Sequence, residues 1–106
     1  MYAVKIEHFE GPFDLLLQLI EGEKLDITQI SLGKITDEYL EHLNDLDARS
    51  HDVAEFLVIA SRLIYIKSKA IIPTLPTAEE EEEIEDLENK LREYKKFLIA
   101  ISAEQR

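Results

Sequence analysis

The sequence predicts a mainly α-helical fold: a small helical bundle with a short N-terminal β-strand, followed by a linker and a protruding amphipathic helix. Apolar residues recur every three or four positions over most of the chain, which puts them on one face of an α-helix. Glycine and proline stand mainly between these stretches, at Gly11, Pro12, Gly22, Pro73 and Pro76. Together the two patterns favour several helices separated by turns.

A strand and a short helix are predicted near the N-terminus. Apolar and polar side chains alternate over residues 2–7, which is the pattern of a strand with one buried face. Pro12 then suits the first turn of a helix, because the N–H that proline lacks would have no partner there. Residues 13–20 are mostly apolar, and Gly22 is a typical helix end.

Two more helices are expected before the linker. Asp26 and Gln29 have the spacing of a capping box, with Asp26 as the N-cap of a turn or two. From Ser31 we expect a longer amphipathic helix, because apolar residues follow at spacings of three and four: Leu32, Ile35, Tyr39, Leu43 and Leu46. Asp52 is the predicted N-cap of the next helix, which stops before Pro73.

The chain is expected to divide into a helical domain over residues 1–72, a linker over residues 73–77 and a partner-binding helix within residues 78–106. Two prolines make the linker stiff and extended. The last helix starts with five glutamates, residues 79–83, which the helix dipole favours as a solvated first turn. A metal site is not expected there, because hard cations need carboxylates that converge on one point.

The helix of residues 53–72 is apolar on almost all sides. Its first face carries Val53, Phe56, Ile59, Ala60, Leu63, Ile66 and Ala70, and its second face carries Ala54, Leu57, Val58, Ser61, Ile64, Tyr65 and Ser68. A helix with two apolar faces is normally buried on two sides. Either this helix is the centre of its own bundle, or a partner covers the second face. Two serines on that face favour a partner, because small residues let another helix approach closely.

The last helix carries a heptad seam formed by Ile84, Leu87, Leu91, Tyr94, Leu98 and Ile101. Phe97 and Ile99 widen the stripe near its end. The seam is too short for an independent coiled coil, so it has to dock on its own domain or on another chain.

Composition argues against most kinds of chemistry. The 106 residues include 12 basic and 23 acidic side chains, and a net charge of −11 repels nucleic acid and anionic lipid. Cysteine is absent, which fits a reducing cytoplasm. His8, His42 and His51 have no metal-ligand spacing, and no nucleophile motif or phosphate-binding glycine loop is present. We therefore expect no enzyme activity, cofactor or metal, and no direct binding to nucleic acid or membrane.

Several segments resemble one family. Residues 9–17, FEGPFDLLL, resemble the F-E-G-P-L-D-L-L-L signature of the segregation and condensation protein A family, the bacterial and archaeal kleisins. Residues 66–73, IKSKAIIP, resemble its I-K-S-[RK]-x-L-L-P motif. Further similarity lies in ITDEYL at 35–40, EFLVIA at 55–60 and LREYKKF at 91–97, so it covers nearly the whole chain in order.

The resemblance implies a scaffold for chromosome condensation and segregation, located in the cytoplasm and associated with the nucleoid. The N-terminal domain of this family packs on the coiled-coil neck of an SMC ATPase, and the middle segment wraps segregation and condensation protein B. A C-terminal winged-helix domain of the family binds the other SMC head; this sequence ends at Arg106 without one, so we expect either an N-terminal fragment or an unusually short member. We expect the second face of the 53–72 helix to meet the SMC neck, and the heptad seam to meet the second partner.

Two other functions remain open from the residues alone. The chain fits a regulatory helical module that homodimerises through its terminal heptad helix. It also fits an acidic accessory domain of a hydrolase, although no pocket chemistry is visible in the sequence.

Overall fold

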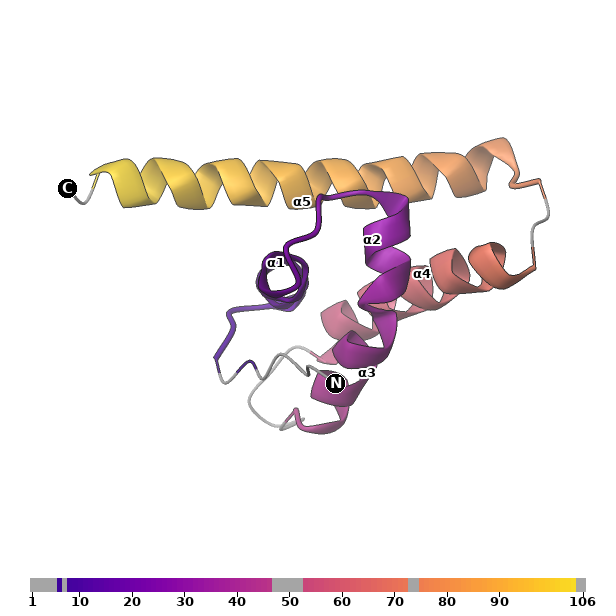
Figure 1. The fold of residues 1–106 in the computed structure, drawn as a ribbon, viewed down its shortest axis with the longest axis horizontal. Coiled ribbons are helices and arrows are strands. Elements are labelled where there is room, and N and C mark those ends of the chain that lie inside the picture. Colours follow the sequence, from indigo (N-terminus) through magenta and orange to yellow (C-terminus); the bar gives the residue numbers. More distant parts are fainter. Residues whose placement is uncertain (1–5, 7, 47–52, 73–74, 105–106) are drawn as a thin grey trace.

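The computed structural model describes residues 6, 8–46, 53–72 and 75–104. Within this part of the chain lie five helices, α1 Pro12–Gly22, α2 Gln29–Lys34, α3 Thr36–Asn44, α4 Val53–Ile71 and α5 Ala78–Glu104 (Figure 1). The mainly helical class is therefore confirmed. The strand predicted for residues 2–7 falls outside the described residues except for Ile6, which is not in a strand.

Helix α1 is the centre of the bundle, and it packs against each of the other four helices (Figure 1). The sequence explains this position, because apolar side chains surround most of the helix and five of them are buried: Leu15, Leu16, Leu17, Leu19 and Ile20. Pro12 occupies the first turn, as predicted, and Gly11 precedes it with a φ of 114°, a value that glycine adopts without strain. Helix α4 also contacts the other four helices, but Leu57, Val58 and Ile64 on its second face are exposed, so the alternative in which the 53–72 helix is the centre of the bundle, buried on both sides, is wrong.

The expected long helix from Ser31 is instead two short helices that meet at Ile35. The Thr36 hydroxyl donates to the Leu32 carbonyl at 2.8 Å and lies 3.4 Å from the Leu63 carbonyl of α4. These bonds hold the bend against α4 and leave Thr36 almost fully buried. A hydrophobic period of three and four continues through such a bend, so the pattern alone does not show it.

The N-cap of α2 is Thr28, and the prediction of Asp26 was wrong. The Thr28 side chain accepts a bond from the Ser31 backbone N–H at 3.2 Å, which satisfies a donor in the first turn. Asp and Thr are both good caps, so local preference does not decide between positions only two residues apart. The predicted N-cap of α4, Asp52, lies outside the described residues.

Helix α4 packs its first face on α2 and α3. The buried members of this face are Phe56, Ile59, Ala60, Leu63 and Ile66. Val53 is half-buried and Ala70 is exposed at the far end of the helix. The assignment of this face to the core is therefore confirmed over the middle of the helix.

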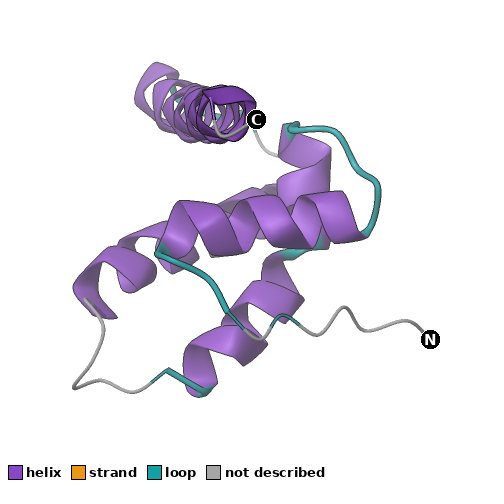
Figure 2. Cartoon of the chain, turned by 90° about the vertical axis from the view of Figure 1, so that its left-hand side faces the viewer, coloured by secondary structure: helices purple, strands orange, loops and turns teal. Residues whose placement is uncertain are grey.

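Helix α5 lies across α1, and the expectation that it protrudes is wrong for its first half (Figures 1 and 2). Ile84, Leu87 and Leu91 are buried in the same core as α1. Arg92 adds a 2.6 Å bond from its guanidinium to the Ile27 carbonyl, and Lys95 lies 3.6 Å from Glu21. The physical reason is that α1 has an apolar side that α2, α3 and α4 leave open, and the seam of α5 covers it.

Candidate protein–protein interfaces

The second face of α4 is exposed to solvent. The exposed fractions of Leu57, Val58 and Ile64 are 52%, 52% and 50%. Ala54, Ser61 and Ser68 are also exposed, and Tyr65 is half-buried. All seven residues predicted for partner binding thus share one side of the helix, and none belongs to the core. Contiguous exposed apolar surface of this kind is typical of sites where proteins meet.

The two serines of this face do not need a polar partner. The Ser61 hydroxyl donates to the Val58 carbonyl at 2.8 Å, and the Ser68 hydroxyl donates to the Tyr65 carbonyl at 2.8 Å. Because both hydroxyls are satisfied within the helix, covering them with an apolar surface leaves no donor unpaired. The serine side chains are therefore small and internally hydrogen-bonded, so another helix can pack closely against this face.

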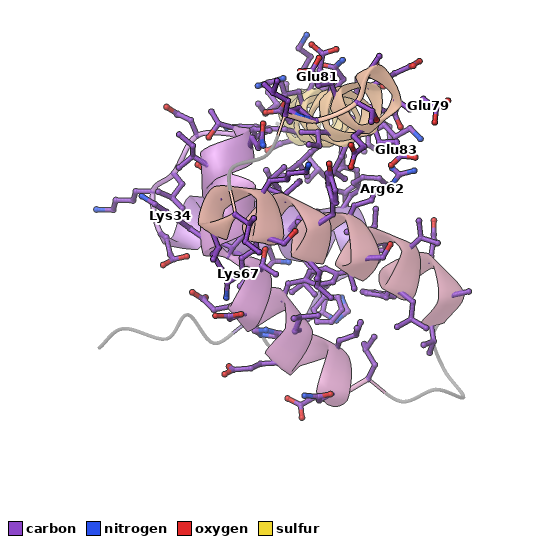
Figure 3. All side chains as sticks on the ribbon, turned by 90° about the vertical axis from the view of Figure 1, so that its right-hand side faces the viewer. Lys34, Arg62, Lys67, Glu79, Glu81 and Glu83 are labelled. Atoms are coloured by element: carbon purple, nitrogen blue, oxygen red, sulfur yellow. The ribbon has the colours of Figure 1, made fainter. Side chains whose placement is uncertain are left out.

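The first turns of α5 border one edge of this face. Thr77 and Glu80 form a reciprocal capping box, with bonds of 2.8 Å and 3.1 Å between each backbone N–H and the other side chain. The neighbouring Tyr65 hydroxyl, followed by the Thr77 bonds, lowers the pKa of Glu80. Arg62 extends from α4 toward α5 and reaches Asp86 at 3.7 Å (Figure 3). The capping box sets where α5 begins, and the Arg62–Asp86 ion pair joins α5 to α4 beside the second face.

The heptad seam of α5 is divided into two parts. Ile84, Leu87 and Leu91 have exposed fractions of 7%, 0% and 0%, so they are covered by this chain itself. Tyr94 and Leu98 are half-buried, and Ile101 is 37% exposed. The structure brings the six predicted residues onto one side of the helix but leaves only the last three exposed in part, with Tyr94 and Leu98 still packed against the edge of the core.

Phe97 was missing from the predicted binding residues, and it is the largest exposed side chain of the open part, with an exposed fraction of 59%. It stands three residues after Tyr94 and four before Ile101, so the helical period already placed it on the same stripe. We call Tyr94, Phe97, Leu98 and Ile101 the distal stripe.

The described residues contain no cluster of three or more acidic, histidine or cysteine side chains with metal-binding geometry. His42 Nδ1 lies 2.8 Å from the Glu38 carbonyl, and His8 is 4.0 Å from Glu10, so each has a neighbour on the surface. His51 lies outside the described residues. None of the helices in this part of the chain combines the length and hydropathy that crossing a membrane requires.

A small helical domain that exposes apolar faces on two of its helices is typical of protein-interaction modules. A family model described as segregation and condensation protein ScpA matches residues 19–105. The chain belongs to the segregation and condensation protein A family.

Members of this family from several bacteria are similar to the chain over most of its length. Segregation and condensation protein A of Caldanaerobacter subterraneus subsp. tengcongensis is 45% identical over 103 residues, which cover 92% of this chain and 42% of that protein. The Clostridium tetani protein is 46% identical over 100 residues, which cover 89% of this chain and 39% of that protein. The chain therefore spans about two fifths of the length of these relatives. No solved structure matches the chain.

Proposed function

We propose that the chain is a non-enzymatic kleisin subunit of an SMC complex that acts in chromosome condensation and segregation. Family membership supports the general role, because the relatives carry segregation and condensation in their names. The observation that supports a binding function is the exposed second face of α4, which is apolar although the first face of the same helix already fills the core. In this proposal the chain works in the cytoplasm and reaches the nucleoid through its partners, without a cofactor or direct contact with DNA or membrane.

The second face of α4 is the proposed site for the coiled-coil neck of an SMC ATPase. A coiled-coil neck is a helix pair with apolar side chains, and it can lie along α4 if small residues line the contact. Ser61 and Ser68 provide that close approach, and Leu57 and Ile64 provide apolar area on either side. The neck would then cover the apolar face of α4 that the domain itself leaves exposed.

The distal stripe is the proposed site for segregation and condensation protein B. The first half of the heptad seam is already used to bind α1, so docking there would require α5 to detach. Binding at the distal stripe needs no such change. The second partner is therefore assigned to Tyr94, Phe97, Leu98 and Ile101 rather than to the whole seam.

A pull-down with the head-plus-neck part of an SMC protein tests the first site. Leu57→Glu or Ile64→Glu should abolish capture, because an unpaired charge buried in the contact costs several kcal/mol, about 2 or more. Ile99→Glu is the matched control, since Ile99 is a similarly exposed apolar residue on α5, at 59%. Circular dichroism should remain helical for all three variants. Equal capture of wild type and both α4 variants would refute the assignment.

A second candidate function is homodimerisation through α5, and the exposed distal stripe supports it as well. Sedimentation of the chain alone separates the two functions. A dimer that persists at micromolar concentration and is lost in Phe97→Asp would favour the homodimer. A monomer that binds segregation and condensation protein B would favour the kleisin subunit.

A further inference from the structure

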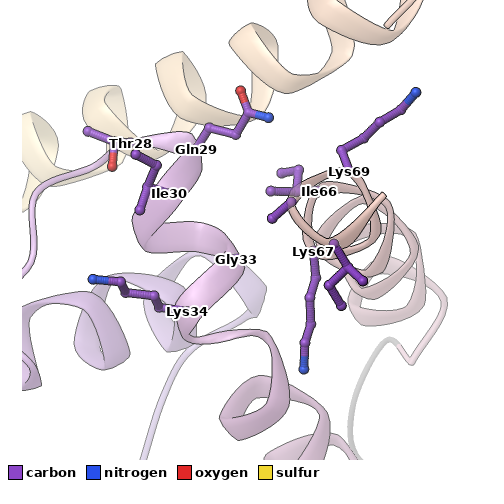
Figure 4. Close-up of a pocket in the computed structure, with 10 residues that line it drawn as sticks. Thr28, Gln29, Ile30, Gly33, Lys34, Ile66, Lys67 and Lys69 are labelled. Atoms are coloured by element: carbon purple, nitrogen blue, oxygen red, sulfur yellow. The ribbon is translucent and has the colours of Figure 1, made fainter. Parts of the chain in front are cut away.

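A groove of about 750 Å³ lies between α2 and the C-terminal end of α4 (Figure 4). Its apolar surface comes from Ile30, Gly33, Ile66, Ala70 and Ile71. Ile30 and Ile71 are 73% and 69% exposed, whereas Ile66 is buried below them. Two large aliphatic side chains therefore stand open to solvent on either side of an apolar floor.

Glycine at position 33 keeps the groove open. A Cβ added there would meet the Ile66 side chain at 3.8 Å, an ordinary van der Waals distance. Glycine inside a helix costs up to about 1 kcal/mol relative to alanine. The position tolerates a side chain, so the fold itself does not require this glycine.

The groove does not have the chemistry of a small-molecule site. Such sites combine apolar walls with a few polar groups that converge on the ligand. Here the Thr28 hydroxyl is bonded to Ser31 at 3.0 Å, and the remaining polar side chains are on long, flexible stems. The apolar side chains of a helix, inserted between Ile30 and Ile71, fit this surface better.

The charges around the groove favour an acidic binding partner. Lys34, Lys67 and Lys69 line it and no carboxylate does, in a chain with a net charge of −11. Lys67 forms an ion pair with Asp37 at 2.6 Å, and the Lys69 amine lies 5.2 Å from the centroid of the Tyr65 ring. Lys34 forms no ion pair with any of the described residues. The end of the groove near Lys34 and Lys67 thus carries a net positive charge.

The groove adjoins the second face of α4 at Ile71 and extends away from it. At 100° per residue Ala70 lies about 180° around the helix from Ser61, in the middle of that face, whereas Ile71 follows Ile64 by seven residues and lies about 20° from it. A partner on the second face could therefore reach Ile71 but would leave the floor of the groove at Ile66 and Ala70 uncovered.

We propose that this groove binds a short amphipathic helix of another protein, whose apolar stripe packs on Ile30, Ile66 and Ile71 and whose acidic side chains meet Lys34 and Lys67. This site shares no residue with the proposed SMC and second-partner sites, although Ile71 borders the first of them. It would give the domain a third interaction surface.

A pair of designed peptides of about 15 residues tests the proposal, since shorter isolated helices are marginal in water. Both carry leucines at helical spacing; one has glutamates beside the stripe and the other has lysines. The acidic peptide should bind at least about tenfold more tightly by fluorescence anisotropy, and more weakly as salt rises. The overall charge of −11 attracts the basic peptide, so a preference for the acidic one has to come from local lysines.

Variants with matched controls locate the binding. Ile71→Asp and Gly33→Met should each weaken the acidic peptide by about tenfold or more, through lost apolar area or a filled groove, while Ile99→Asp has no effect. Lys34→Glu should weaken it by about threefold or more, whereas Lys96→Glu, which changes the net charge equally, should not. Tighter binding of the basic peptide, no binding of either, or unchanged affinity in Gly33→Met would overturn the proposal. Self-association lost in Ile71→Asp would overturn it too, in favour of a second copy.

Discussion

The Tyr39 hydroxyl donates a hydrogen bond of 2.9 Å to the backbone carbonyl of Phe56, which ties α3 to the first turns of α4. Tyr39 is fully buried, and burial, followed by the nearby Glu55 carboxylate, raises its pKa. The ring of Phe56 packs edge-on against Phe9 at a centroid distance of 5.8 Å. Together with the Thr36 bond to the Leu63 carbonyl and the Asp37–Lys67 ion pair, this bond fixes the register of α3 against α4.

Tyr39→Phe tests the contribution of this bond. Removing the hydroxyl leaves the ring in place but takes a partner from a buried carbonyl, so we expect a loss of about 1 kcal/mol in the free energy of unfolding. Urea denaturation followed by circular dichroism measures this difference. Tyr94→Phe is the control, because the ring of Tyr94 is only half-buried on α5 and should change stability less. Identical midpoints for Tyr39→Phe and wild type would show that the bond contributes nothing net.

The two faces of α4 should respond oppositely to truncation. Phe56→Ala and Leu63→Ala remove buried side chains, with exposed fractions of 2% and 0%, and should each lower stability by about 2–5 kcal/mol. Leu57→Ala is the matched control on the same helix. It should stay within about 0.5 kcal/mol, because the side chain is half exposed in the isolated chain. Melting temperatures that fall equally for Leu57→Ala and Leu63→Ala would contradict the division into core and open faces.

Periodicity identified both apolar faces of α4 but did not distinguish them; the two serines of the second face indicated which one the chain leaves open. Phe56 and Leu57 are adjacent, similar in hydrophobicity and opposite in burial, because only the surrounding helices decide which side is filled. The same limit applies to α5, where Leu91 is fully buried and Leu98, seven residues later on the same seam, is only half-buried. The difference in burial between Leu91 and Leu98 comes from α1, whose open apolar side is covered by the first half of the α5 seam.

The capping box of α5 predicts a pH dependence. The Tyr65 hydroxyl and then the Thr77 bonds of the capping box lower the pKa of Glu80 below its ordinary value of 4.5, so its ionised form stabilises the fold. This contribution is fully present above pH 4.5 and is lost as the pH falls through the lower, folded pKa. Glutamine can keep the bond to the Thr77 N–H but cannot ionise.

Thermal melts from neutral to acidic pH measure the difference between Glu80→Gln and wild type. We expect the difference in melting temperature to be largest at neutral pH and to shrink below pH 4.5. Glu82→Gln is the control for the general effect of removing one negative charge from the acidic run, because Glu82 is exposed. A difference for Glu80→Gln that does not change with pH would contradict the assigned role of this carboxylate.

Helix α5 has two separable functions along one seam, and two aspartate substitutions distinguish them. Leu91→Asp places a charge in the core beside α1, which should lower stability by several kcal/mol, about 2 or more, and release α5. Phe97→Asp changes a residue that is 59% exposed, so the melting temperature should stay near that of wild type. If the distal stripe is the site for segregation and condensation protein B, Phe97→Asp nevertheless abolishes that binding while binding to the SMC neck persists. Deleting residues 78–106 is a poorer test, because it also uncovers the apolar side of α1 that Leu87 and Leu91 protect. Calorimetry of each variant with the second partner gives the answer, and unchanged affinity in Phe97→Asp would exclude the distal stripe as its binding site.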